Sequence, residues 1–166
     1  MKAIARSIIV LSVLLLGTAL LAIQQAGPGI FVNGEGNEER QPVEEWFRLP
    51  YHWQAGVVLP GIWTASPRDA TLLVMDNPGA VFGISARSIT VVKDKTGAVR
   101  EVIAGYDETT SRKSRAALLA ALQKNIGVFT GTEVKKLADG SLGFTGGGLS
   151  IILATAGGVT VTLSRA

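Results

Sequence analysis

The single histidine of the chain, His52, lies in an aromatic run at residues 51–53 (YHW). Histidine has an ordinary pKa near neutrality, so a histidine general base in this chain would have to be His52. A hydrolase also needs an activated nucleophile. The nearest pattern, residues 83–87 (GISAR), has arginine where the second glycine of G-x-S-x-G belongs. We therefore expect no catalytic residue, and a hydrolase that uses His52 is kept as the second alternative.

Two adjacent acids, Asp107 and Glu108, stand immediately before a predicted helix. A pair of carboxylates can act as acid and base in glycoside cleavage, but two neighbours in sequence do not face each other across a substrate. Both acids also occupy the place where negative charge stabilises the N-terminus of a helix. The sequence therefore predicts helix caps.

A basic cluster follows these acids, and its three cations are Arg112, Lys113 and Arg115. At a helix N-terminus they oppose the helix dipole, so a bound phosphate, sulfate or anionic headgroup would relieve the arrangement. The hydroxyl groups of Thr110 and Ser111 could assist. The candidate anion-binding residues are thus Thr110, Ser111, Arg112 and Arg115. The alternative is a solvated basic face that the preceding acids partly neutralise.

Composition excludes several kinds of site. The chain has no cysteine and one histidine, so disulfides, thiolate nucleophiles, cysteine-ligated metals and sites with two imidazoles are all excluded, and we predict no metal and no cofactor. The net charge of +3 includes Lys2 and Arg6, and without them 14 basic residues face 13 acidic ones. Such a balance does not indicate nucleic acid as a partner.

Aromatic residues are concentrated in residues 43–64, which hold all three tryptophans and half of the ten aromatic side chains. Pro50 and Pro60 rule out one continuous helix there. One hypothesis is an aromatic ligand-binding surface, and the other is that the rings cap the core. The surface hypothesis names Trp46, Tyr51, His52, Trp53 and Trp63.

The N-terminal residues 1–26 have the pattern of an export segment. Lys2 and Arg6 precede an uncharged run of 17 residues at positions 7–23. This pattern is typical of a signal peptide or of a single-pass anchor in the inner membrane over residues 7–26, and the two positive charges would keep the N-terminus inside. Cleavage after Ala19 or Ala22 and retention are both left open. Either outcome predicts an extracytoplasmic location, periplasmic or secreted.

The remaining chain divides into a linker and one domain. Residues 27–42 are rich in glycine, proline and glutamate, which is typical of a flexible acidic linker. Residues 43–166 contain four predicted hairpins and one helix. The hairpins pair 71–75 with 80–85 around 76–79, 88–93 with 98–104 around 94–97, 133–138 with 141–144 around 139–140, and 149–155 with 159–164 around 157–158. The helix spans 110–125 with Gly127 at its C-cap.

The order hairpin, hairpin, helix, hairpin, hairpin predicts an α+β fold. We expect a mainly antiparallel sheet built from successive hairpins, packed against one central amphipathic helix and preceded by the N-terminal hydrophobic helix. Residues 149–156 are apolar on both faces, so we expect a central strand there.

The C-terminal strands are almost uncharged, since Arg165 is the only charged residue in 141–166. Such strands are either interior or available for pairing with a partner, including self-association. We therefore expect a non-catalytic extracytoplasmic module of the cell envelope that contacts an envelope protein or the membrane surface. The alternative is a binding protein for a small apolar or anionic ligand.

Overall fold

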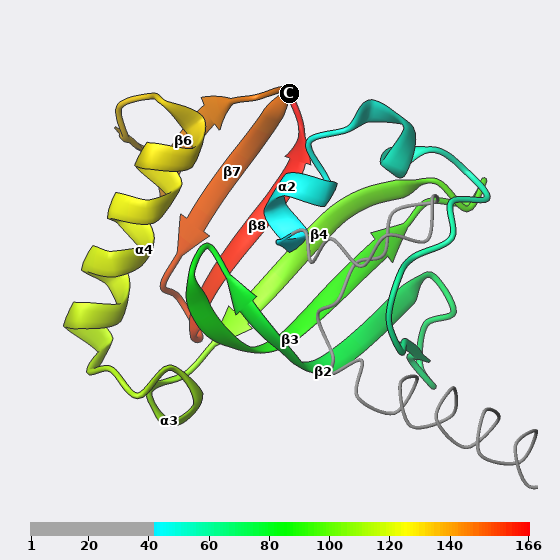
Figure 1. Ribbon diagram of the computed structural model, residues 1–166, viewed down its shortest axis with the longest axis horizontal. Helices are drawn as coiled ribbons and strands as arrows, with labels where there is room; N and C mark the ends of the chain where they lie inside the picture. Colours follow the sequence, from blue (N-terminus) through cyan, green and yellow to red (C-terminus); the bar gives the residue numbers. More distant parts are fainter. Residues whose placement is uncertain (1–41) are drawn as a thin grey trace, which may run out of the picture.

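The computed structural model describes residues 42–166, which form an eight-stranded antiparallel sheet with the strand order β1-β2-β3-β4-β8-β7-β6-β5 (Figure 1). The strands are β1 (Thr64–Ala65), β2 (Leu72–Val81), β3 (Ile84–Lys93), β4 (Val99–Tyr106), β5 (Lys135–Lys136), β6 (Leu142–Gly146), β7 (Leu149–Ala154) and β8 (Val159–Arg165). The helices are α2 (Val43–Trp46), the 3-10 helix η1 (Pro50–Trp53), α3 (Glu108–Ser111) and α4 (Arg115–Thr130).

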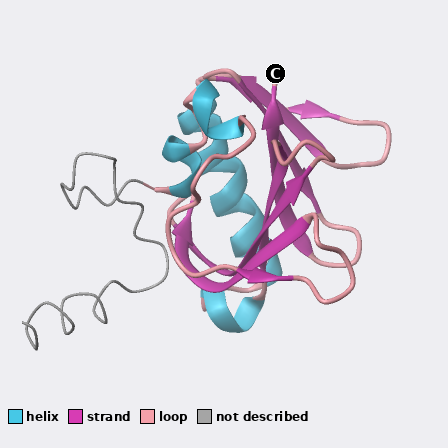
Figure 2. Cartoon of the chain, turned by 90° about the vertical axis from the view of Figure 1, so that its right-hand side faces the viewer, coloured by secondary structure: helices cyan, strands magenta, loops and turns pink. Residues whose placement is uncertain are grey.

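All of these helices lie on one face of the sheet, and no helix of residues 42–166 covers the other (Figure 2). The strands alternate accordingly. One row of neighbouring side chains on the helical face, Val91, Val102, Leu163 and Ile151, is fully buried. The side chains that alternate with them on the opposite face are half-buried. The sheet therefore has one packed face and one open face, as an antiparallel sheet permits.

The predicted antiparallel α+β architecture is confirmed, but the helix is not central. Helix α4 packs along β6 and β7 at one side of the sheet, burying Leu118, Leu122 and Ile126 at four-residue spacing (Figure 1). The rest of the packed face is covered by α2, η1 and the tip of the β2–β3 hairpin. At that tip Phe82 contacts Phe129 of α4 edge to face, with 5.3 Å between ring centroids.

Three predicted hairpins are confirmed, and their turns use the expected side chains. Asp94 accepts hydrogen bonds from the N–H groups of Thr96 and Ala98 in the β3–β4 turn. Asp139 accepts one from Ser141 in the β5–β6 turn. In the β7–β8 turn the backbone φ of Gly157 is 73°, a left-handed value that glycine adopts without strain.

The predicted turn at residues 76–79 is wrong. Strand β2 continues through these residues, and the pairing with β3 shifts between Asp76 and Gly79 as a β-bulge. Asn77 and Gly79 have φ values of 50° and 89°, so the asparagine and glycine that suggested a turn instead provide the left-handed positions of the bulge. The chain reverses later, at Phe82 and Gly83, because this places Phe82 in the core.

The predicted helix over 110–125 is also corrected. Arg112 takes a left-handed conformation, with φ of 53°, and this ends α3 before α4 begins at Arg115. Gly127 lies inside α4 and is not its C-cap. The C-cap is Gly131, whose φ is 65° and whose N–H donates to the carbonyl of Gly127.

The uncharged C-terminal strands are interior. Strands β7 and β8 each pair on both sides, which confirms the central strand predicted over 149–156, and the two ends of the sheet are the two-residue strands β1 and β5. Self-association through β7 or β8 would therefore have to use their open face.

The predicted leader, residues 1–26, and residues 27–41 of the predicted linker lie outside the described residues. Within residues 42–166, no helix has the length and apolar character needed to cross a membrane.

Candidate functional site

Two of the three tryptophans named for an aromatic surface belong to the core. Trp46 and Trp53 are 5% and 4% exposed. The indole N–H of Trp53 donates to the carbonyl oxygen of Phe47 at 2.7 Å, which satisfies the polar atom of a buried ring. Trp63 is half-buried, and its indole N–H donates to the carbonyl of Pro60 at 2.9 Å. The rings thus cap the packed face of the sheet.

His52 is part of the same packing. Its ring stacks on Trp46 with 3.5 Å between centroids, and its Nδ1 donates a hydrogen bond to the Trp46 carbonyl at 2.6 Å. Burial lowers the pKa of His52, and the bond to the carbonyl offsets part of that effect. A neutral ring held between an indole face and a carbonyl is a structural arrangement.

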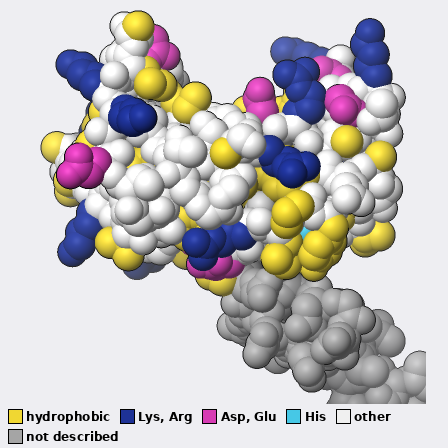
Figure 3. All heavy atoms as spheres, turned by 90° about the horizontal axis from the view of Figure 1, so that it is seen from above, with side chains coloured by type: hydrophobic (Ala, Val, Ile, Leu, Met, Phe, Trp, Pro, Cys, Tyr) yellow, Lys and Arg dark blue, Asp and Glu magenta, His cyan; other side chains and the backbone are white. Residues whose placement is uncertain are grey.

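The exposed part of this region is aliphatic. Four large apolar side chains are exposed between residues 49 and 62: Leu49 (40%), Tyr51 (55%), Val58 (85%) and Ile62 (83%). We call residues 49–62 the apolar surface segment. Figure 3 shows hydrophobic side chains around the small visible part of His52. Tyr51 is the one member of the predicted aromatic surface that is exposed.

The residues of the candidate anion site lie together at the junction of α3 and α4, but polar groups of Thr110, Ser111 and Arg115 have partners within the domain. Asp107 accepts from the N–H of Thr110 at 2.7 Å, and Ser111 donates its hydroxyl to the Asp107 carbonyl. Glu108 accepts from the N–H of Arg115 at 3.0 Å. The predicted capping role of both acids is confirmed, and the hydrogen bonds from Thr110 lower the pKa of Asp107.

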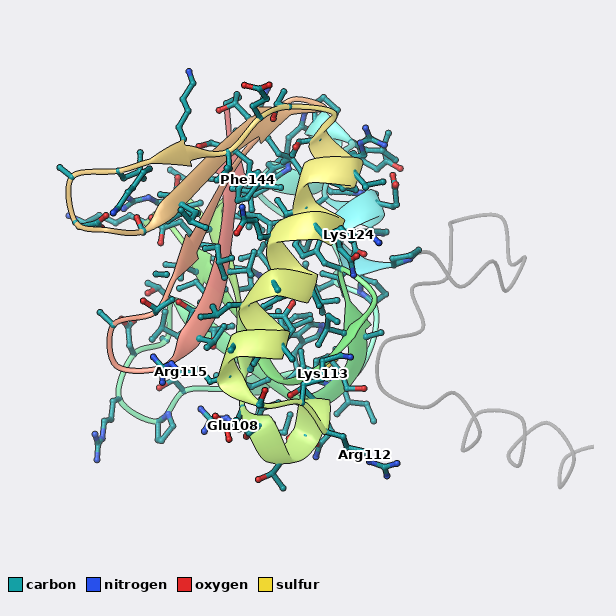
Figure 4. All side chains as sticks on the ribbon, turned by 90° about the vertical axis from the view of Figure 1, so that its left-hand side faces the viewer. Glu108, Arg112, Lys113, Arg115, Lys124 and Phe144 are labelled. Carbon is teal, nitrogen blue, oxygen red and sulfur yellow. The ribbon has the colours of Figure 1, made fainter. Side chains whose placement is uncertain are left out.

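The two arginines of that candidate site point in different directions. Arg115 donates to the carbonyl of Thr155 at 2.6 Å, toward the β7–β8 turn. Arg112 extends from the opposite side of the helical junction (Figure 4). The site therefore does not present a preformed pair of guanidinium groups.

A cleft of about 270 Å³ opens beside Arg115. Its charged lining consists of Arg87, Asp107, Glu108 and Arg115, and the backbone of the β7–β8 turn closes one side. Arg87 is 3.9 Å from the Asp107 carboxylate. Two cations and two anions make the cleft electrically balanced, so it does not favour an anion over other small polar molecules.

A larger groove, of about 670 Å³, lies between α4 and the segment that leads into β5. Its floor includes Phe144, and Val128 on α4 is 77% exposed at its side. Lys124 and Glu133 provide the charged groups of the lining, and Figure 4 labels Lys124 on α4 and Phe144 on the adjoining strand. The groove falls within the size range of small-molecule sites.

Glu44 is the most unusual polar group of the described residues, and no sequence pattern indicated its burial. The side chain is 7% exposed, its Oε1 accepts from the N–H of Phe82 at 2.9 Å, and its Oε2 has no hydrogen-bond partner within residues 42–166. Burial raises the pKa of Glu44 from its ordinary value of 4.5 to about 7. The carboxyl group thus links α2 to the hairpin tip. Its burial lowers the stability of the fold at high pH, where the group is charged.

Two further side chains hold the same hairpin tip. Asn125 of α4 donates to the carbonyl of Phe82 at 2.7 Å, and the hydroxyl of Tyr106 donates to the carbonyl of Val81 at 3.0 Å. Burial, and then the nearby charge of Glu44, raise the pKa of Tyr106 well above its ordinary value. These contacts fix the hairpin over the core, which is a structural role.

Comparison of the chain with protein-family models, with curated proteins and with solved structures gives no match.

Proposed function

We propose that this chain is a non-catalytic module of the cell envelope that its N-terminal segment directs to export. The module contacts the membrane surface through the apolar surface segment 49–62. One observation carries the proposal: Val58 and Ile62 are 85% and 83% exposed, although each side chain is large and aliphatic. Exposed apolar side chains that are grouped along one segment are typical of a surface that binds a partner or a membrane.

The charge of this segment supports a lipid surface. The apolar surface segment contains no acidic residue, and Arg48 and Arg68 lie on either side of it, with Arg48 also paired with Glu45 at 3.1 Å. Anionic headgroups repel carboxylates and attract arginine. Tyr51, which is 55% exposed, belongs to a residue type that is enriched at the interface between water and lipid.

The position of the segment in the chain gives further support. Only residues 24–42 separate the apolar run at 7–23 from the start of α2 at Val43, and the segment follows α2 directly. An N-terminal anchor in the inner membrane would thus hold this segment near the same bilayer, where a weak apolar contact becomes effective because the local concentration is high.

The test uses the absence of cysteine, which makes any introduced cysteine the only thiol. Val58→Cys in the full chain is labelled with an environment-sensitive dye and reconstituted in vesicles that contain anionic lipid. Val128→Cys, on the outer side of α4, is the matched control because its side chain is 77% exposed. We expect the dye at position 58 to shift its emission to the blue and to be protected from an aqueous quencher, while the dye at 128 is quenched. Equal quenching at both positions would contradict the proposal.

The groove beside α4 favours a second candidate function, the binding of a small ligand with apolar and anionic parts. Phe144 and Val128 offer apolar surface. The charged groups of the lining are one cation, Lys124, and one carboxylate, Glu133, so the anionic part of such a ligand would have to bind at Lys124. The probe is anilinonaphthalene sulfonate, which combines an aromatic body with a sulfonate. We expect its fluorescence to increase with the full chain and to fall with Lys124→Ala. An unchanged response in that variant would remove this candidate.

A further inference from the structure

The open face of the sheet carries an almost uncharged centre. The register places Val74, Thr90, Ile103, Thr162 and Ile152 side by side across five consecutive strands. All five are half-buried, because neighbouring strands shield part of each side chain. A sheet face that stays in water usually carries charged side chains among its polar ones. A row of alternating aliphatic and hydroxyl side chains is instead suited to contact with another protein.

The rows on either side of this centre are also poor in charge. One contains Glu101, which pairs with Ser164 on the adjacent strand. The other contains Asp76, Ser88, Gly105 and Thr160 side by side, with Asp76 on β2, near the edge of the sheet. Depletion of charged residues at the centre is what distinguishes protein interfaces from other surfaces.

We propose that the open sheet face binds the same face of a second copy of this chain. Two identical faces that pack together are related by a two-fold axis lying between them, so a surface used in this way must be complementary to itself. An axis parallel to the strands through Ile103 would bring Glu101 against Glu101 of the second copy, which like charges oppose. An axis along the central row avoids this.

With the axis along the row, each residue of the row faces its own counterpart. Because Glu101 and Gly105 lie two residues before and after Ile103, Glu101 then faces Gly105 of the second copy. The absence of a side chain at Gly105 leaves room for the carboxylate. The hydroxyl groups of Ser88 and Thr160, on either side of Gly105, can donate hydrogen bonds to that carboxylate. The carboxylate of Glu101 therefore has a partner site on the identical face, and the other acidic residue of these rows, Asp76, is exposed on β2 near the edge of the sheet.

The size of the face is sufficient for a modest dimer. Six strands, β2, β3, β4, β8, β7 and β6, have five residues or more. At a spacing of about 4.8 Å and a length of about 20 Å, they present on the order of 600 Å² per copy, against roughly 800 Å² per partner in a standard interface. A second copy is thus the occupant whose contact area and charge pattern this face satisfies.

The test measures the molecular mass of the full chain, solubilised in detergent, by light scattering over a wide range of protein concentrations. We expect wild type to change from one chain to two as concentration rises. Thr162→Lys and Thr90→Lys, in the central row, should stay monomeric, since each places two like charges near the axis. Gln123→Lys, on the exposed side of α4, adds the same charge elsewhere and should dimerise as wild type does.

Circular dichroism of each variant confirms that the sheet is intact before its mass is interpreted, and two independent row variants guard against a folding defect in one. A wild type that is monomeric at every concentration would overturn the proposal. So would dimers that persist in both row variants, because the association would then use another surface, such as the N-terminal segment. Neither result bears on membrane contact by the apolar surface segment, which the quenching experiment tests separately.

Discussion

Ile151 and Ile152 are neighbours on β7, yet they belong to different surfaces. Ile151 is fully buried beneath the helices, whereas Ile152 is half-buried on the open face. The packed face combines aliphatic side chains with aromatic rings and one buried carboxyl group, and the open face combines aliphatic side chains with hydroxyl groups and the carboxylates of Glu101 and Asp76. The comparison shows that one sheet can hold a domain together on one side while its other side stays available for contacts.

The largest difference between the two faces should be the stability lost when each of these two isoleucines is truncated. Ile151→Ala should lower the free energy of unfolding by about 2–5 kcal/mol, because it leaves a cavity in a packed core. Ile152→Ala should lower it by less than about 1 kcal/mol in the monomer, since no covering layer is lost. Chemical denaturation at a concentration where the chain is monomeric measures both, and equal losses would show that the open face is covered.

The next effect concerns the carboxyl group on the packed face. The pKa of Glu44 is raised from 4.5 to about 7 in the folded domain, so the unfolded chain loses its proton at a lower pH than the folded one. The contribution of Glu44 to the free energy of unfolding is therefore fully present below pH 4.5 and is lost as pH rises through 7. Glu44→Gln should raise the free energy of unfolding at pH 8 by up to about 3 kcal/mol and should have little effect at pH 4.

The matched control for this prediction is the adjacent Glu45→Gln. Glu45 is partly exposed and forms a salt bridge with Arg48 at 3.1 Å, so its removal should change stability by about 0–1 kcal/mol. Denaturation curves for both variants between pH 4 and 9 separate the two roles. A stability difference between wild type and Glu44→Gln that is the same at pH 5 and pH 8 would show that the Glu44 carboxyl is solvated.

The smallest expected effect tests how the hairpin tip is held on the packed face. Asn125→Ala removes the hydrogen bond to the carbonyl of Phe82 and should cost about 1 kcal/mol of unfolding free energy. Gln123→Ala, two residues earlier and exposed, should be close to neutral. Hydrogen exchange at the tip should accelerate only in the first variant, and similar exchange in both would mean that the tip is held by packing alone.

Short-range patterns were sufficient to predict much of this fold. Asp94 and Asp139 each stand in a turn whose geometry depends on residues within four positions, and both turns were found where predicted. The capping acids Asp107 and Glu108 also act locally. The run at 149–156, apolar on both faces, predicted β7 as a central strand, and β7 does lie between two other strands.

The errors arose where distant residues decide the outcome. Asn77 and Gly79 suit a turn and a bulge equally, and the choice depends on burying Phe82 against α4, more than forty residues away. Gly127 resembles a C-cap, but α4 continues to Thr130. The burial of Glu44 follows from contact with Phe82, which is 38 residues further along the chain. No local pattern could have indicated that a glutamate beside a linker would enter the core.

The claim that unites these surfaces is that the open face contacts a second copy, and Thr162 lies on the proposed two-fold axis. Thr162→Cys in the full chain, reconstituted in vesicles and treated with a mild oxidant, should form a disulfide-linked dimer rapidly, because each thiol faces its counterpart. Lys95→Cys, in the exposed β3–β4 turn, should crosslink only slowly through collisions. Equal, slow crosslinking at both positions would contradict the account.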